Sequence, residues 1–202
     1  ANFAILGLSD HSAVIFNIRR GGILRTFAHG DRVRSVDLNR VGTLAITGSE
    51  DYSASLRGIA SGKKLTSYKH EDDVQLVKLS PDGKLAFSVS KYDKALIWKT
   101  DSGEALGEIP LQSERLKRGI MFTCARFNDD GSLLITGRPD QTVELWDVAT
   151  LSNIGRWRLP KRELWKPTSA AVIDVSFSSQ NGKIYAIASN GFIHELSYPD
   201  NI

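Results

Sequence analysis

The sequence predicts an all-β protein made of small antiparallel sheets that repeat along the chain. Short apolar runs are bounded by turn residues, and two kinds of turn recur in step with each other. The first turn contains Asp10, Asp51, Asp93 and Asp140, with Asn190 at the same place in a last copy, so its steps are 41, 42, 47 and 50 residues. The second turn contains Gly42, Gly83, Gly131 and Gly182. Two markers that keep the same period indicate a structural repeat.

The copy from Asp72 onward shows the elements of one repeat in order. "VQLVKLS" is a predicted strand, "PDGK" a turn, "LAFSVS" a second strand, "KYDK" a turn, "ALIW" a third strand, "TDSGE" a turn and "ALGEI" a fourth short strand. Pro and Gly suit the early and the positive-φ positions of such turns. Each period therefore predicts four antiparallel strands.

The inner strands are apolar on consecutive positions, as in "LLIT", "LAFS" and "IYAIAS". A strand with one solvent-exposed face would alternate apolar and polar residues. Apolar residues on both faces indicate that each sheet is covered on both sides. Four-stranded sheets arranged radially, each packed between two neighbours, meet this requirement, so the predicted architecture is a β-propeller of four-stranded antiparallel blades.

Composition sets limits on the class of protein. The chain has 202 residues, of which 41% are apolar and 24% charged, as in soluble globular domains. Its net charge of +3 is too small to indicate nucleic-acid binding by itself. With Cys124 as its one cysteine, the chain cannot form an internal disulfide. No apolar run approaches the ~20 residues of a membrane span, and no signal peptide is present. The compartment stays open: cytoplasmic, or envelope-anchored if an upstream signal has been removed.

Further residues recur at fixed places within the repeat. Trp146-Asp147 ends one third strand, and Trp98-Lys99 ends another. Small hydroxyl residues precede the Trp place by ten positions, and two histidines lie before them. With these residues the repeat resembles the WD40 family. The resemblance implies a structural hydrogen-bond network in each repeat, whose members here are His29, Thr47, Asp51, His70, Ser88, Asp93, Trp98, Thr136, Asp140 and Trp146. Phe16, Arg57 and Leu196 occupy the Trp place in the remaining copies.

The network residues have physical roles that are structural. Trp fills the space between blades and offers one N–H, which a hydroxyl can accept. Asp in a turn accepts backbone N–H groups that would otherwise be unpaired. The repeated Asp residues are therefore interpreted as turn stabilisers, no residue is assigned to catalysis, and the four histidines have no metal-ligand spacing.

The ends of the chain bear on the number of blades. The first copy begins at its second strand, so the chain holds about four and a half repeats, in blades at approximately 1–20, 21–60, 61–101, 102–150 and 151–202 of a single domain. We interpret the chain as the C-terminal part of a larger propeller, with a closed five-blade ring as the alternative. An open sheet edge on a truncated chain would permit self-association.

Two long connections are the candidate binding residues. They are 110–120 and 159–170, which link the outer strand of one blade to the inner strand of the next. Arg and Trp are common in binding hot spots, and long loops on a rigid scaffold often bind partners. The predicted docking patch, for an acidic protein segment, consists of Arg115, Lys117, Arg118, Lys161, Arg162, Trp165 and Lys166. The alternative is a pair of solvated loops. Trp157 is predicted to pack on an outer strand, with Arg156 and Arg158 facing water.

The predicted function is a non-catalytic scaffold for protein–protein interaction, without a cofactor. One alternative is a propeller enzyme of the lactonase or quinoprotein kind, which would need several inward-facing acids or histidines at one level; Asp37 and Asp174 are isolated and out of step. The other alternative is nucleic-acid binding, which the low net charge and the lack of an aromatic stacking series disfavour.

Overall fold

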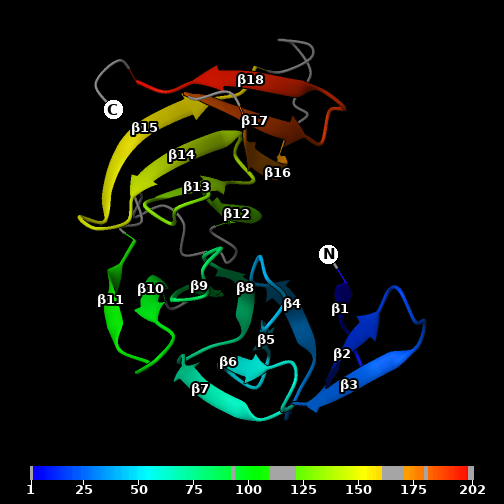
Figure 1. The fold of residues 1–202 in the computed structure, drawn as a ribbon. Helices are drawn as coiled ribbons and strands as arrows, with labels where there is room; N and C mark the ends of the chain where they lie inside the picture. Colours follow the sequence, from blue (N-terminus) through cyan, green and yellow to red (C-terminus); the bar gives the residue numbers. More distant parts are fainter. Residues whose placement is uncertain (1, 92–93, 110–121, 161–170, 180–181, 200–202) are drawn as a thin grey trace. The chain divides into compact units, whose positions relative to one another are not determined.

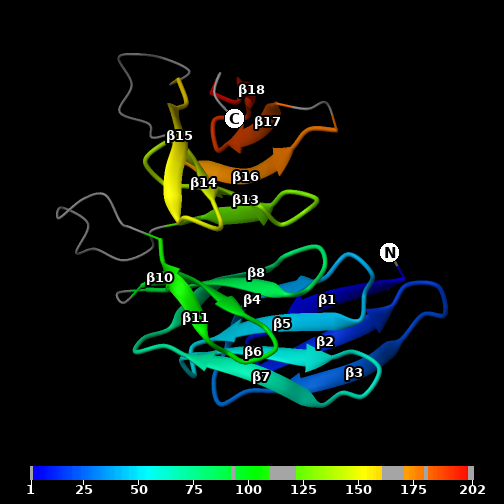
Figure 2. The ribbon, with the colours of Figure 1, turned by 60° about the vertical axis from the view of Figure 1, so that its left-hand side comes forward.

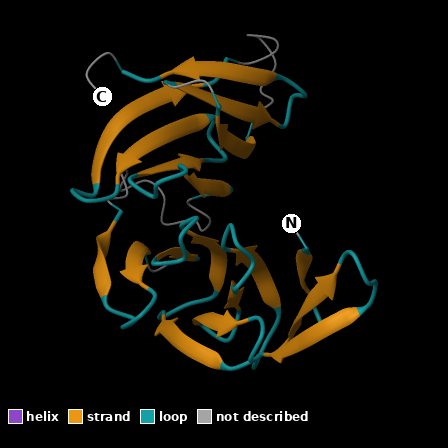
Figure 3. Ribbon diagram, in the orientation of Figure 1, coloured by secondary structure: helices purple, strands orange, loops and turns teal. Residues whose placement is uncertain are grey.

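The prediction of an all-β protein is confirmed in the computed structural model. The structure describes residues 2–91, 94–109, 122–160, 171–179 and 182–199, and every regular element within them is a strand (Figure 3). The chain separates into two compact units, Ala1–Gly119 and Ile120–Ile202, called unit 1 and unit 2 below.

Unit 1 consists of three antiparallel sheets that follow one another along the chain (Figure 1). Each strand pairs with its neighbour in sequence through a short turn, as antiparallel strands allow. Figure 2 shows the strands of this unit from a second direction. The three-stranded sheet is β1 (Phe3–Gly7), β2 (Ser12–Asn17) and β3 (Ile23–Ala28); the four-stranded sheets are β4 (Val33–Leu38), β5 (Leu44–Ser49), β6 (Ser53–Gly58) and β7 (Lys64–Lys69), then β8 (Val74–Leu79), β9 (Leu85–Ser90), β10 (Ala95–Lys99) and β11 (Ala105–Glu108).

Unit 2 consists of two sheets of the same kind. The first has four strands: β12 (Cys124–Phe127), β13 (Leu133–Gly137), β14 (Thr142–Asp147) and β15 (Ser152–Arg158). The second has three: β16 (Val172–Phe177), β17 (Lys183–Ala188) and β18 (Ile193–Ser197). Among the described residues, the sheet of β1 to β3 lacks the innermost strand of a blade, and the sheet of β16 to β18 lacks the outermost.

The sheets are offset by one strand from the predicted repeats. The first strands within the predicted blades 21–60, 61–101, 102–150 and 151–202 are β3, β7, β11 and β15, and each is the last strand of the preceding sheet. A blade is therefore completed by the chain that opens the next repeat, which links consecutive blades covalently. The assignment of residues 1–202 to a single domain stays a prediction.

The recurrent Asp turns join the second and third strands of the sheets. In each, a side-chain oxygen accepts the backbone N–H two residues later, and the residue between them has a left-handed conformation, which is uncommon outside glycine. The pairs are Asp10–Ser12, Asp51–Ser53, Asp140–Thr142 and Asn190–Phe192, at 3.1, 2.9, 3.2 and 3.2 Å. The intervening residues are His11, Tyr52, Gln141 and Gly191, with φ of 71°, 71°, 76° and 84°. Asp93 lies outside the described residues.

Neighbouring sheets within a unit fit together at a repeated glycine contact. A glycine near the end of the second strand faces a valine of the next sheet's first strand. A Cβ added to Gly7, Gly48 or Gly137 would lie 3.0, 2.7 and 2.5 Å from a methyl carbon of Val33, Val74 and Val172. At such distances a larger residue would require the neighbouring valine to shift. In the sheet of β16 to β18, the residue at this glycine place is Ile187. It pairs with Ile193 at the start of β18 and is 39% exposed.

A β-bulge recurs where the third strand meets the outer strand. The register shifts next to Phe16, Arg57, Trp98 and Trp146, which are the residues at the Trp place. The residue left without a partner on the outer strand is Leu24, Leu65, Leu106 and Ile154, respectively. The bulge places one extra residue of the outer strand opposite the Trp place of the third strand, and it increases the local twist of each sheet.

Candidate protein-binding site

The residues predicted to form the docking patch lie outside the described residues. They are Arg115, Lys117, Arg118, Lys161, Arg162, Trp165 and Lys166. The structure does describe the point where the second predicted loop begins. The Leu159 N–H donates to the Gln141 carbonyl at 2.9 Å, and Thr142 pairs with Arg158 in the sheet. The loop therefore begins beside the Asp140 turn of unit 2.

A surface cavity of about 350 Å³ lies at this end of β14 and β15. Asp140, Thr142, Arg156, Trp157 and Arg158 line it. Arg156 and Arg158 are exposed on the outer strand, and Trp157 between them packs against the hydrophobic core of unit 2. The lining thus combines two guanidinium groups and an indole ring with one carboxylate, that of Asp140, and its excess of positive charge suits recognition of a carboxylate-bearing segment.

A buried carboxylate lies within ion-pair distance of one of these guanidinium groups. The side chain of Glu144 is fully buried, and its Oε1 lies 3.7 Å from Arg156 Nε. On the other side, Arg138 Nε donates to Glu144 Oε2 at 2.7 Å, and the Arg138 guanidinium lies 5.0 Å from the centre of the Phe122 ring. Two arginines share one buried carboxylate, so this part of unit 2 keeps a surplus of positive charge beside the cavity.

Sequence reasoning did not single out Glu144, Arg138 or Phe122. One signal was available: Glu144 is a charged residue within the apolar third strand "TVELW", and Arg138 stands at the place of Ser49 and Ser90 in other repeats. A charge on a buried strand requires a partner of opposite sign, and the arginine that directly follows the adjacent strand was the candidate.

The second repeat brings together all of its predicted network residues. His29 Nδ1 lies 2.9 Å from Asp51 Oδ2, and His29 Nε2 lies 2.8 Å from Thr47 Oγ1. Burial raises the pKa of Asp51, but hydrogen bonds from the Ser53 hydroxyl, the Gly30 N–H and His29 outweigh it and lower that pKa to about 2. Burial lowers the pKa of His29, against the opposing effect of Asp51. A neutral His29 therefore donates to Asp51 and accepts the Thr47 hydroxyl.

Arg57 takes the Trp place in this repeat without joining the network. Its Nη2 donates to the Ala28 carbonyl at 3.1 Å, and its guanidinium lies 5.1 Å from the centre of the Phe27 ring. The pKa of Arg57 is lowered, chiefly by burial. Arg57 thus uses its length to reach the outer strand of the preceding sheet.

The third repeat has the Trp that the second lacks. Ser88 Oγ lies 2.8 Å from His70 Nε2 and accepts the Trp98 indole N–H at 3.1 Å. Trp98 is fully buried, and its ring lies 6.3 Å from that of Tyr68. The predicted Asp93 lies outside the described residues, so the structure does not place it.

The fourth repeat contains the hydroxyl–indole pair. Trp146 donates its indole N–H to Thr136 Oγ1 at 2.9 Å, and both side chains are fully buried. Asp140 does not join them: its carboxylate accepts the Thr142 N–H in the turn. In the described part of the chain, no three His, Cys, Asp or Glu side chains are placed to hold a metal ion, and no helix could cross a membrane.

Comparison with known proteins gives the same repeat. The family model "WD domain, G-beta repeat" (WD40) matches residues 21–56 and 117–147. Eukaryotic translation initiation factor 3 subunit I of Schizosaccharomyces pombe is 30% identical over 96 residues, which are 47% of this chain and 25% of that protein. WD repeat-containing protein 91 of Gallus gallus is 29% identical over 98 residues, which are 48% of this chain and 12% of that protein.

Solved structures share the fold over nearly the whole chain. The β-propeller domain of Myceliophthora thermophila Cps50 (Swd1) superposes with a TM-score of 0.78 at 15% identity, over 98% of this chain and 63% of that one. The computationally designed Ika8 protein superposes with a TM-score of 0.74 at 16% identity, over 98% of this chain and 56% of that one. The chain therefore spans less than two thirds of each of these proteins, and the predicted β-propeller fold is confirmed.

Proposed function

We propose that this chain is a WD40-repeat protein and acts as a non-catalytic protein-binding module, because two of its regions match the WD40 family model, its fold is that of β-propellers, and WD40 domains commonly mediate protein–protein interaction. The proposed contact surface is the cavity of unit 2 at the end of β14 and β15. Its proposed partner is an acidic segment of another protein.

The observation that carries the proposal is the charge and shape of that cavity. Arg156, Arg158 and Trp157 line it together with Asp140, and the buried Glu144, which is paired with Arg138, lies within ion-pair distance of Arg156. A guanidinium held by a buried partner loses less rotamer freedom when a ligand carboxylate binds to it. The predicted loop with Lys161, Arg162, Trp165 and Lys166 begins at this cavity and would extend the basic surface.

The outer strand adds a second means of binding. β15 is the last strand of its sheet, so one of its backbone edges has no strand partner among the described residues. An extended segment could pair with this edge while its acidic side chains meet the arginines, a mode in which backbone bonds supply affinity and side chains supply specificity.

The test measures binding of a fluorescein-labelled decapeptide of alternating glycine and glutamate by fluorescence anisotropy. We expect the double variant Arg158→Glu, Lys161→Glu to weaken binding about tenfold or more, because two attractive charges become repulsive. Arg156 is left unchanged because its replacement would also disturb the buried Glu144. The charge reversal of Arg118 and Lys161 is expected to act in the same direction, with thermal unfolding unchanged.

Arg126→Glu is the matched control. Arg126 is also an exposed arginine of unit 2, with 51% of its side chain exposed, and it lies on β12 beside Asp174. Equal weakening by Arg126→Glu would mean that the peptide senses only net charge. Unaltered binding in the Arg158 and Lys161 double variant would reject the proposed surface.

A further inference from the structure

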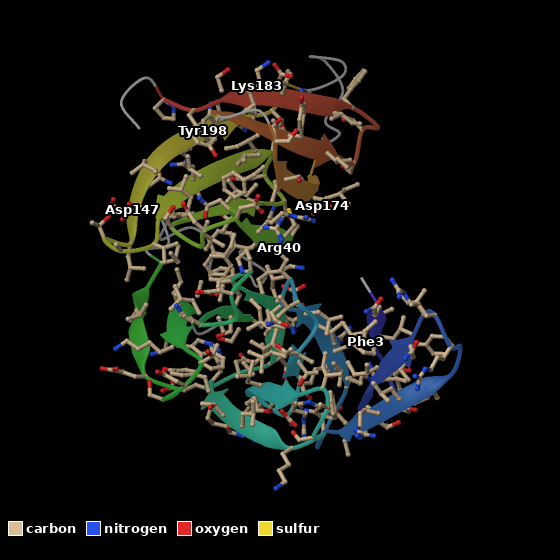
Figure 4. All side chains as sticks on the ribbon, in the orientation of Figure 1. Phe3, Arg40, Asp147, Asp174, Lys183 and Tyr198 are labelled. Atoms are coloured by element: carbon tan, nitrogen blue, oxygen red, sulfur yellow. The ribbon has the colours of Figure 1, made fainter. Side chains whose placement is uncertain are left out.

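Unit 2 has a second hollow at the other end of its sheets. A groove of about 790 Å³ lies between two turns, the one that joins β12 to β13 and the one that joins β16 to β17. Residues that line it include Asp129, Asp130, Ser132, Phe177, Ser178 and Tyr198. Tyr198 follows directly after β18, at the place labelled in Figure 4.

The corresponding turns of unit 1 are closed against each other. The Arg40 N–H donates to the Pro81 carbonyl at 3.1 Å, which joins the turn after β4 to the turn after β8. A Cβ added to Gly83 in the second of these turns would lie 2.7 Å from a methyl carbon of Leu44. Gly182 has the same place in unit 2, and a Cβ added there meets no atom within 4 Å. The groove is thus a departure from the repeat pattern.

Two aromatic rings form the apolar part of the groove. Phe177 ends β16 and packs edge to face with Tyr198, with ring centroids 6.3 Å apart and ring planes at 82°. Both side chains are only partly buried, and both pack at the margin of the hydrophobic core of unit 2. Perpendicular rings present one face and one edge to the groove, and an aromatic face attracts a cation.

The polar part of the groove is negative. Asp130 accepts the Ser132 N–H at 2.8 Å, and hydrogen bonds from the Ser132 hydroxyl and backbone lower the pKa of Asp130, so it carries its charge at neutral pH. Burial, and then the nearby charge of Asp130, raise the pKa of Tyr198, so the phenol stays neutral and can donate. The described lining residues include Asp129 and Asp130 but no lysine or arginine.

We propose that this groove binds a lysine or arginine side chain presented by a segment of another protein. The cation would lie against the Phe177 and Tyr198 rings and pair with Asp130, which combines cation–π attraction with a charge-assisted hydrogen bond. This site lies at the opposite end of the strands from the basic cavity and selects the opposite charge. A propeller unit with both sites could bind two different segments at once.

The experiment uses the full chain and a labelled decapeptide of alternating glycine and arginine, with binding followed by fluorescence anisotropy. A second peptide replaces arginine by citrulline, which has the same shape without the charge. We expect the citrulline peptide to bind at least about tenfold more weakly, because it retains stacking but loses the ion pair. Equal binding of the two peptides would overturn the proposal.

Three variants locate the contact. Asp130→Asn keeps an oxygen that can accept the Ser132 N–H, so the turn is retained while the charge is lost, and Phe177→Leu keeps apolar volume without a ring. Each is expected to weaken the arginine peptide about three- to tenfold. Asp82→Asn is the matched control, since Asp82 accepts the Lys84 N–H at 3.0 Å in the closed turn of unit 1.

The variants also separate this site from the basic cavity. Asp130→Asn should leave binding of the glutamate peptide unchanged, and Arg158→Glu should not weaken the arginine peptide. If Asp82→Asn weakens the arginine peptide as much as Asp130→Asn does, the peptide is responding to total charge and the groove is not its site.

Discussion

Two neighbouring sheets of unit 1 contain nearly the same hydrogen-bond network around different residues. In the sheet of β4 to β7, His29 bonds to both Thr47 and Asp51, and Arg57 stands apart from them. In the sheet of β8 to β11, Ser88 meets His70 and Trp98. The histidine–hydroxyl contact is 2.8 Å in both, so it forms with or without the indole. The Trp place is therefore first a packing position and only second a hydrogen-bonding one.

Substitution by alanine at the Trp place should give the largest difference in the free energy of unfolding between the two sheets. Trp98 is fully buried in a core with Leu96, Val77 and Ile46, and its loss leaves a large cavity. We expect Trp98→Ala to lower the free energy of unfolding by about 3–5 kcal/mol. Arg57→Ala removes one hydrogen bond and a cation–π contact and should cost about 1 kcal/mol. Urea denaturation measures both, and equal losses would contradict the packing interpretation.

Removal of the Asp51 carboxylate should have the second-largest effect on the free energy of unfolding. Asp51 accepts hydrogen bonds from His29, the Gly30 N–H and both donors of Ser53. Asp51→Ala should therefore lower the free energy of unfolding by about 2–3 kcal/mol. Asp10 holds the same turn place but, among the described residues, accepts only from Ser12, so Asp10→Ala should cost less than about 1 kcal/mol. A similar loss in the free energy of unfolding at both positions would mean that only the hydrogen bonds within the turn contribute to stability.

The smallest expected effect is on the pH dependence of stability. The pKa of Asp51 in the folded protein, about 2, lies below its ordinary 3.8, so its contribution is complete above pH 3.8 and is lost between pH 3.8 and 2. That loss should amount to about 1–2 kcal/mol for a partly exposed group. The pKa of His29 lies below 6.5, so uptake of a proton by the unfolded chain lowers stability as the pH falls below 6.5.

Two variants check this assignment in urea titrations across pH. Asp51→Ala should reduce the loss of stability below pH 3.8, and His29→Gln should reduce the slope below pH 6.5. A slope below pH 6.5 that is unchanged in His29→Gln would assign it to another histidine.

The fold followed from the sequence because its signals are local. Each Asp turn and each Gly turn shapes only the four or five residues around it, so the period of Asp51, Asp93 and Asp140 could be counted without knowing any tertiary contact. The bulge beside the Trp place was not predicted, although Leu24, Leu65 and Leu106 recur at equal steps of 41 residues. In the sequence, a single apolar residue on an outer strand cannot be distinguished from the ordinary alternation of apolar and polar residues along a strand, so the bulge was missed.

The candidate sites were less accessible to sequence reasoning. The pairing of Glu144 with Arg138 depends on the register of β13 and β14, and the groove at Tyr198 depends on how far two turns lie apart, which differs between Gly83 and Gly182 although both turns read alike. Recurrent sequence predicts what the repeats share. Binding surfaces arise where the repeats differ, so the pattern that identified the fold could not identify them.

The glycine contact between sheets sets a rule for shuffling or duplicating parts of this chain. Gly48 leaves space for Val74, and Gly137 leaves space for Val172. A sheet moved to another place in the chain would therefore bring only one residue of such a glycine–valine pair. A copy of the strands from Val172 onward, appended after β18, would press its valine against Ile187 instead of a glycine. Extension of the array at that end therefore requires either Ile187→Gly or an incoming strand with a smaller residue at the valine position.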